Sequence, residues 1–130
     1  MSEKTKVLVI DDDPDIHAFC TLVLEAAGYA VTVAASAAEG RAAMAAARPD
    51  LVILDIMMEQ ADAGFDAAQW FAREYPGLPV LMLSSIADAA DSLFDTSTLG
   101  VADLVNKPIS PEELLAKVQR LLARRARAEY

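Results

Sequence analysis

Acidic side chains directly follow two strand-like segments of the sequence. Asp11, Asp12 and Asp13 follow the apolar run VLVI, and Asp55 follows the apolar run LVIL. If these segments lie side by side in a parallel sheet, their carboxylates meet at one edge, where they repel one another unless a cation is bound. Carboxylate oxygens suit Mg²⁺ or Ca²⁺, whereas one Cys and one His cannot build a zinc site. The pattern therefore predicts a site for a hard divalent cation.

Two further polar side chains follow later strand-like segments. Ser84 follows the run PVLML, and Lys107 follows ADLVN. A cation held by carboxylates, a hydroxyl group and an ammonium group together suit the binding of a phosphoryl group. A carboxylate among them can act as the nucleophile, as in aspartyl-phosphate chemistry. We therefore expect phosphoryl chemistry at this edge.

The elements that must position these side chains alternate regularly along the chain. We expect strands at 5–10, 29–34, 51–54, 79–83 and 102–105, and helices at 14–27, 36–46, 64–75, 84–99 and 111–122. Such alternation predicts an α/β fold with a parallel sheet and right-handed crossovers. Five strands suit a doubly wound, flavodoxin-like (βα)5 architecture in the order 2-1-3-4-5. In that order the first and third strands are neighbours, which brings Asp11, Asp12 and Asp55 together.

Helix-capping signals support these boundaries. Asp13 can cap a helix that begins at Pro14. Ser36 with Glu39 has the spacing of a capping box. Ser110 precedes Pro111 and a glutamate at the third helical position, which is the strongest start signal in the chain.

Length and charge restrict the class of protein. The 130 residues fit a single domain (1–130, with its core at about 5–124), and the formal net charge is −9. The acidic balance argues against direct binding to nucleic acid and to anionic membranes. No apolar run approaches the roughly 20 residues that span a bilayer. With one cysteine and no signal-peptide pattern, we expect a cytoplasmic protein.

Four motifs, taken together, resemble one known family. VLVIDDDP, LVILD, PVLMLSS and NKP, in this order and spacing, resemble the receiver domain of two-component response regulators. The resemblance implies that Asp55 is the phosphoacceptor and that Mg²⁺ is the cofactor. It further implies roles for five other positions: Asp11 and Asp12 as metal ligands with Asp55, Met57 as a ligand through its backbone carbonyl, and Ser84 and Lys107 as contacts of the phosphoryl group.

The resemblance also implies partners and a mode of action. A sensor histidine kinase or a histidine phosphotransfer protein would donate the phosphoryl group, and the domain would catalyse only its own phosphorylation and dephosphorylation. The surface formed by 84–99, 102–105 and 111–122 would switch, contact a downstream effector protein and offer a face for a homodimer. Three features depart from the family pattern: Glu59 stands at a usual proline, the loop from Asp55 to Gly64 is one residue longer than the common form, and Leu104 stands at a usual aromatic residue.

Two other functions remain as alternatives. One is a degenerate receiver that acts only as a protein-interaction module. The other is a phosphatase similar to haloacid dehalogenases, with Asp11 as nucleophile and Asp13 as acid and base, although Asp15 stands where that family has Thr or Val. Two side chains near the acids receive structural interpretations: His17 as an exposed helical residue and Cys20 as a small buried one.

Overall fold

A five-stranded parallel sheet forms the centre of the molecule. The computed structural model describes residues 4–55, 63–84, 103–106 and 109–128. The strands lie in the order β2-β1-β3-β4-β5, and every neighbouring pair is parallel. Their bounds are β1 (Lys6–Ile10), β2 (Ala30–Ala34), β3 (Leu51–Asp55), β4 (Val80–Ser84) and β5 (Asp103–Asn106). The predicted doubly wound α/β fold and its strand order are confirmed.

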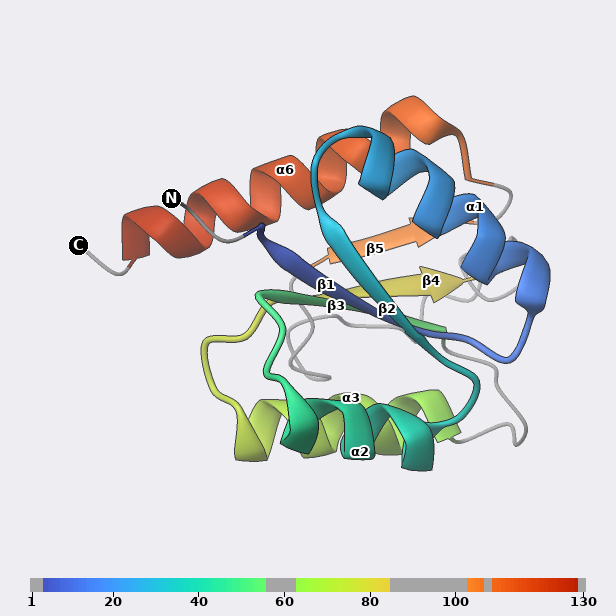
Figure 1. Ribbon diagram of the computed structural model, residues 1–130. Coiled ribbons are helices and arrows are strands. Elements are labelled where there is room, and N and C mark those ends of the chain that lie inside the picture. Colours follow the sequence, from blue (N-terminus) through green and yellow to red (C-terminus); the bar gives the residue numbers. More distant parts are fainter. Residues whose placement is uncertain (1–3, 56–62, 85–102, 107–108, 129–130) are drawn as a thin grey trace.

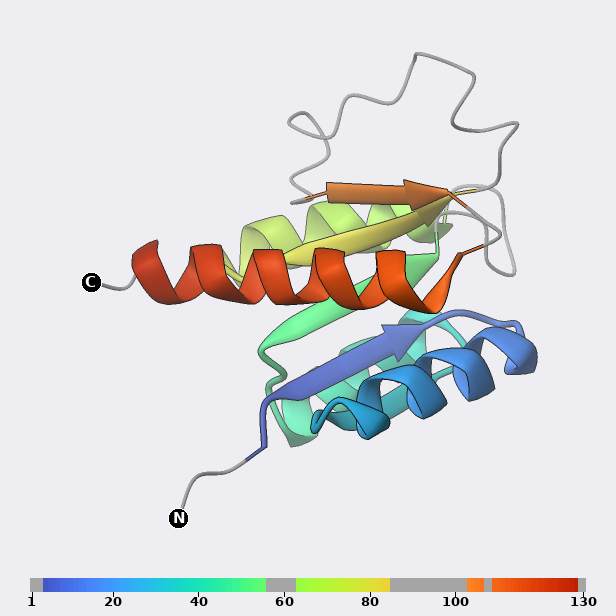
Figure 2. The ribbon, with the colours of Figure 1, turned by 90° about the horizontal axis from the view of Figure 1, so that it is seen from above.

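Helices cover both faces of this sheet. α1 (Pro14–Ala26) and α6 (Pro111–Ala128) lie on one face, and α2 (Ala37–Ala46) and α3 (Ala63–Glu74) lie on the other (Figure 1). Seen from above, α1 and α6 run side by side over the strands (Figure 2). The helix predicted at 84–99 lies almost wholly outside the described residues. Within the described ranges, no helix combines the length and the apolar character needed to cross a membrane.

The strands bury both of their faces, which explains their nearly continuous apolar sequences. Because successive side chains of a strand point to opposite faces, each strand contributes to two separate cores. One core packs under α2 and α3 and includes Leu8, Ile10, Met44, Val52, Leu54, Phe71 and Met82. The other packs under α1 and α6 and includes Val7, Val9, Cys20, Leu24, Ile53, Leu83, Leu114 and Val118. The prediction that Cys20 is buried is confirmed.

The predicted caps are present at the starts of three helices. The Asp13 side chain accepts a hydrogen bond from the Asp15 N–H at 2.9 Å at the start of α1. Ser36 accepts from the Glu39 N–H at 3.1 Å, and Ser110 accepts from the Glu113 N–H at 3.0 Å. Each bond satisfies a backbone N–H that the helix itself leaves without a partner. The caps therefore fix where each helix begins after its loop.

Candidate functional site

The strand register brings the ends of β1, β3, β4 and β5 to one edge of the sheet. Ile10 pairs with Leu54, one residue before Asp11 and Asp55 respectively. Asp55 itself pairs with Leu83, and Ser84 pairs with Asn106. In a doubly wound sheet, ligands bind beyond this edge, near the point where the strand order reverses. Here that point lies between β1 and β3.

Three carboxylates meet at this point. Carboxylate oxygens of Asp11, Asp12 and Asp55 all lie within 4.8 Å of one another. The Asp11 side chain is fully buried and Asp55 is 3% exposed, whereas Asp12 is exposed. Three negative charges so close together favour a bound cation, and their oxygens are the ligands that Mg²⁺ and Ca²⁺ prefer. We call Asp11, Asp12 and Asp55 the acidic cluster.

Backbone hydrogen bonds hold Asp11 in place. Its N–H donates to the carbonyl oxygen of Ala34 at the end of β2 at 3.0 Å. Its carboxylate oxygen Oδ1 accepts from the Asp13 N–H at 2.9 Å. Asp13 in turn caps α1, so the turn that carries Asp11 and Asp12 is tied to β2 and to the first turn of α1.

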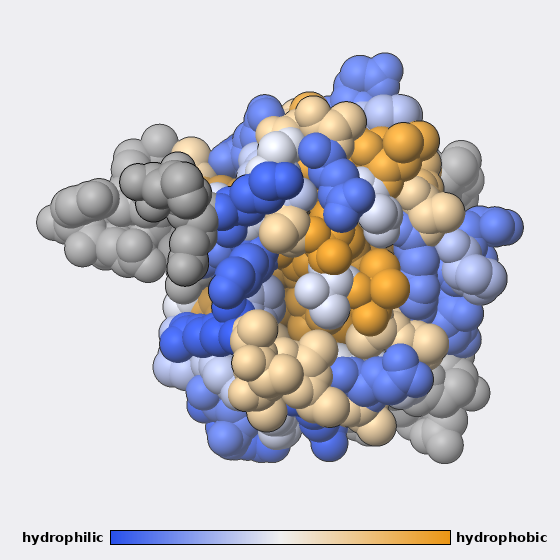
Figure 3. Space-filling model, viewed as in Figure 1, coloured by the Kyte–Doolittle hydropathy of each residue, from blue (hydrophilic) through white to orange (hydrophobic). Residues whose placement is uncertain are grey.

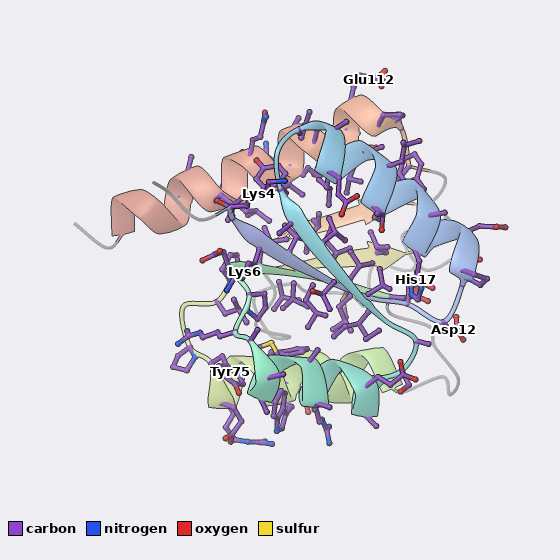
Figure 4. The ribbon with its side chains drawn as sticks, in the orientation of Figure 1. Lys4, Lys6, Asp12, His17, Tyr75 and Glu112 are labelled. Carbon is purple, nitrogen blue, oxygen red and sulfur yellow. The ribbon has the colours of Figure 1, made fainter. Side chains whose placement is uncertain are left out.

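The structure contradicts the interpretation of His17 as an exposed helical residue. The residue is half-buried rather than exposed, and its ring nitrogen Nε2 contacts the carbonyl oxygens of Asp11 and of Ala34, the latter at 3.1 Å. In Figure 4, His17 and Asp12 lie together at one end of β1, and Lys4 and Lys6 lie at the other end. Helical periodicity alone could not reveal this contact, because one acceptor belongs to a distant strand.

The remaining predicted site residues are only partly described. Ser84 is the last residue of β4, but its side chain is outside the described part of the structure. Met57 and Lys107 lie outside the described residues altogether, as does Glu59. Leu104 lies in β5, with its side chain likewise outside the described part. The roles of Ser84, Met57 and Lys107 therefore stay predictions.

A cavity of about 240 Å³ lies far from the acidic cluster. It is lined by residues from the start of β1, from β2, from the end of α2 and from the segment after α2, among them Lys6, Leu8, Thr32, Ala43, Ala47 and Pro49. Figure 3 shows apolar side chains gathered over β2 on this face of the molecule, and Val33 of this strand is 44% exposed. The cavity opens at the amino-terminal half of β1, so it does not belong to the candidate site.

Comparison with known proteins identifies relatives of the whole fold. A family model described as "Response regulator receiver domain" matches residues 7–119. The DNA-binding dual master transcriptional regulator RpaA of Synechocystis is 38% identical over 123 residues, which cover 92% of this chain and 49% of RpaA. The probable transcriptional regulatory protein TcrX of Mycobacterium tuberculosis is 36% identical over 118 residues, which cover 91% of this chain and 50% of TcrX. The chain thus spans about half the length of these curated relatives.

Two solved structures share the fold over nearly their full length. A CheY-like receiver domain protein from Methanospirillum hungatei superposes with a TM-score of 0.87 at 27% identity, covering 97% of this chain and 99% of its own. A putative response regulator from Chloroflexus aurantiacus gives a TM-score of 0.82 at 31% identity, covering 93% of this chain and 99% of its own.

The expectation of no direct nucleic-acid partner is contradicted. RpaA is described as DNA-binding, as is the response regulator MtrA of Mycolicibacterium smegmatis, which is 34% identical over 121 residues. The expectation rested on a net charge of −9. The net charge of this chain describes only the surface of its own residues. RpaA and MtrA are about twice as long, so their additional residues are not included in that charge. The acidic composition was therefore not grounds for excluding nucleic acid as a partner.

Proposed function

The chain belongs to the family of response regulator receiver domains, and on this premise we propose that it accepts a phosphoryl group on Asp55 in a Mg²⁺-dependent reaction. The family is one of signalling domains rather than classical enzymes. The donor is a sensor histidine kinase or a histidine phosphotransfer protein. The observation that carries the proposal is the acidic cluster, with Asp55 almost fully buried at the end of a central strand.

In this proposal Asp55 is both the nucleophile and a metal ligand, whereas Asp11 and Asp12 are metal ligands only. A carboxylate oxygen of Asp55 attacks the phosphorus of the donor's phosphohistidine, and the phosphorus–nitrogen bond breaks. The product is an acyl phosphate on Asp55, and the released imidazole takes up a proton from solvent. Asp11, Asp12 and Asp55, with the backbone carbonyl of Met57, would hold Mg²⁺. When bound, the ion neutralises charge on the phosphoryl oxygens and on the carboxylates.

Two further residues complete the proposed site. The Lys107 ammonium group pairs with a phosphoryl oxygen and supplies a positive charge that the acidic cluster lacks. The Ser84 hydroxyl donates a hydrogen bond to another phosphoryl oxygen, which couples the phosphate to the segment after β4. Ser84 lies at the end of β4, one residue beyond the register partner of Asp55 in the adjacent strand, and this position supports the assignment. Because relatives such as RpaA are named transcriptional regulators, we propose control of transcription as the output.

Intact-mass measurement after incubation with acetyl phosphate and Mg²⁺ tests the function. The wild-type protein should gain the mass of one phosphoryl group, and the adduct should be lost in alkali because acyl phosphates hydrolyse. Asp55→Asn should abolish the adduct. Asp50→Asn is the matched control, since it removes a carboxylate directly before the opposite end of β3 while leaving an acceptor for the Lys6 N–H.

The outcomes separate the proposed function from its alternatives. An adduct that persists in Asp55→Asn but disappears in Asp11→Asn would assign the nucleophile to Asp11, as in the phosphatase alternative. Absence of any adduct, with acetyl phosphate and with a phosphorylated histidine phosphotransfer protein, would indicate a receiver that acts only through protein contacts. Either result would overturn the proposal.

A further inference from the structure

A single nitrogen of His17 joins the ends of β1 and β2. Its Nε2 contacts the carbonyl oxygen of Asp11 and lies 3.1 Å from the carbonyl oxygen of Ala34. Carbonyl oxygens only accept hydrogen bonds, so Nε2 must carry a hydrogen and donate to both. The ring thereby connects the first turns of α1 to the ends of two strands. Figure 4 shows His17 beside Asp12 at this end of the sheet.

The carbonyl group of Asp11, which His17 contacts, lies between two residues of the acidic cluster. It belongs to the peptide group that joins Asp11 to Asp12, two members of the acidic cluster. A peptide group is planar, so a donor that fixes its oxygen also fixes the rotation on either side of the plane. Those rotations set the direction of the Asp12 side chain relative to that of Asp11.

The other peptide group of Asp11 is also held. The Asp11 N–H donates at 3.0 Å to the same Ala34 oxygen that His17 contacts. The Asp11 carboxylate accepts from the Asp13 N–H at 2.9 Å. Asp11 is therefore fixed on three sides, whereas Asp12 is exposed to solvent. The contact with His17 fixes the Asp11–Asp12 peptide group as well.

We propose that His17 is a positioning residue, which holds the Asp11–Asp12 peptide so that both carboxylates face the metal position beside Asp55. This inference rests on the proposed function, because it takes the acidic cluster to be a Mg²⁺ site. Without a cation, repulsion among the carboxylates favours turning the exposed Asp12 away towards water. A fixed peptide group restricts Asp12 before the ion binds, so less conformational entropy is lost on binding. Groups behind metal ligands commonly act in this way.

Two substitutions of equal polarity test the role of the Nε2 position. The amide nitrogen of Gln can occupy the place of Nε2, whereas that of Asn corresponds to Nδ1 and falls short. Titration calorimetry with MgCl2 alone, on the unphosphorylated full chain, measures affinity without phosphotransfer. His17→Asn should raise the Kd for Mg²⁺ about tenfold, and His17→Gln should restore most of the affinity. Ala18→Asn is the matched control: it places the same residue at an exposed neighbour in α1 and should leave the Kd unchanged.

If His17 had a purely structural role, the stability and Mg²⁺ affinity of the two variants would change differently. Substitution would then lower the stability to urea in both His17 variants and leave the Kd for Mg²⁺ of the folded protein unchanged. Equal Mg²⁺ affinity in wild type and His17→Asn would overturn the inference, and so would failure of His17→Gln to bind better than His17→Asn. If the wild type binds Mg²⁺ with this dependence on His17 but forms no adduct, the proposed phosphotransfer fails and the positioning role stands. If the wild type binds no Mg²⁺, the positioning role is wrong.

Discussion

The acidic cluster places like charges close together, and two of its three carboxylates are buried. Asp11 is fully buried and Asp55 is 3% exposed, and their oxygens lie within 4.8 Å of each other and of Asp12. At an effective dielectric constant of 20, two unit charges at this separation repel by about 3.5 kcal/mol. This mutual repulsion is unfavourable in the absence of a cation, as is expected of a site arranged for binding.

Removing one of these charges should stabilise the metal-free protein. We expect Asp55→Asn to raise the free energy of unfolding by about 1–3 kcal/mol in the presence of a chelator, because the amide retains the shape without the charge. In saturating MgCl2 the advantage should shrink or reverse, because the variant loses a ligand. Urea unfolding in EDTA and in MgCl2 measures both values. Asp50→Asn should show no such gain, and a loss of stability for Asp55→Asn in EDTA would contradict the repulsion.

Individual residues differ in how far the sequence could predict them. The meeting of Asp11, Asp12 and Asp55 follows from parallel strands that end at one edge, so residue type and strand order sufficed. The contacts of His17 did not follow, because its acceptors are backbone oxygens, and the one in Ala34 lies 17 positions away. Backbone acceptors leave no signature in residue types. For this reason a residue interpreted as exposed proved to be half-buried beside the cluster.

At the scale of elements, α2 packs on β1 through a glycine. Gly40 lies in the middle of α2 and is buried against the side chain of Ile10. A Cβ at position 40 would overlap Cδ1 of Ile10 and lie 3.0 Å from its Cγ1. Ile10 is itself fully buried, so its side chain has little room to move away. The glycine thus allows a close approach of helix to strand directly before Asp11.

Gly40→Ala should destabilise the protein, although alanine is the better helix former. Helix propensity favours the change by about 1 kcal/mol, whereas overpacking a core costs about 1–3 kcal/mol. We expect a net loss of about 1 kcal/mol in the free energy of unfolding. Ile10→Val removes the overlapping Cδ1, so it should cost less in the Gly40→Ala variant than in the wild type. Urea unfolding of the two single variants and the double variant measures this coupling.

A substitution elsewhere in α2 provides the control for helix propensity. Ala45 is exposed in the same helix. Ala45→Gly should therefore lower the free energy of unfolding of the protein by about 1 kcal/mol, because glycine is the poorer helix former. A stabilising effect of Gly40→Ala, or equal costs of Ile10→Val with and without Gly40→Ala, would show that the helix can move away from β1 without penalty.

The sequence predicted the elements better than the contacts between them. Caps at Asp13, Ser36 and Ser110 are local signals, and all three helices begin where those residues predict. Even so, the Glu39 carboxylate accepts from the Ala35 N–H, one residue before the cap, rather than from Ser36 as in a standard capping box. The close approach at Gly40 was not predicted, because it depends on the position of Ile10 in another element.

Charge is distributed unevenly over the part of the molecule that the structure describes. The acidic cluster and Asp13 lie at the carboxyl edge of the sheet, and Lys4 and Lys6 lie at the amino-terminal end of β1 (Figure 4). The formal net charge of −9 therefore has a local component at the candidate site and a diffuse component elsewhere. These components respond differently to salt. Monovalent ions screen charges over roughly 10 Å at 0.1 M, whereas the cluster's oxygens are within 4.8 Å of one another and partly buried.

Mg²⁺ should therefore stabilise the whole protein far more than Na⁺ at equal ionic strength. A ligand at 100 times its Kd adds about 2.7 kcal/mol to the free energy of unfolding if it binds only the folded state. Screening by NaCl acts mainly on the diffuse charge and should add much less, because it barely reaches inside the cluster. Urea unfolding in MgCl2 and in NaCl of matched ionic strength, analysed with a common m value, gives the two increments. Equal increments from the two salts would mean that the diffuse charge, and not a cation site at the sheet edge, governs the response of the fold to ions.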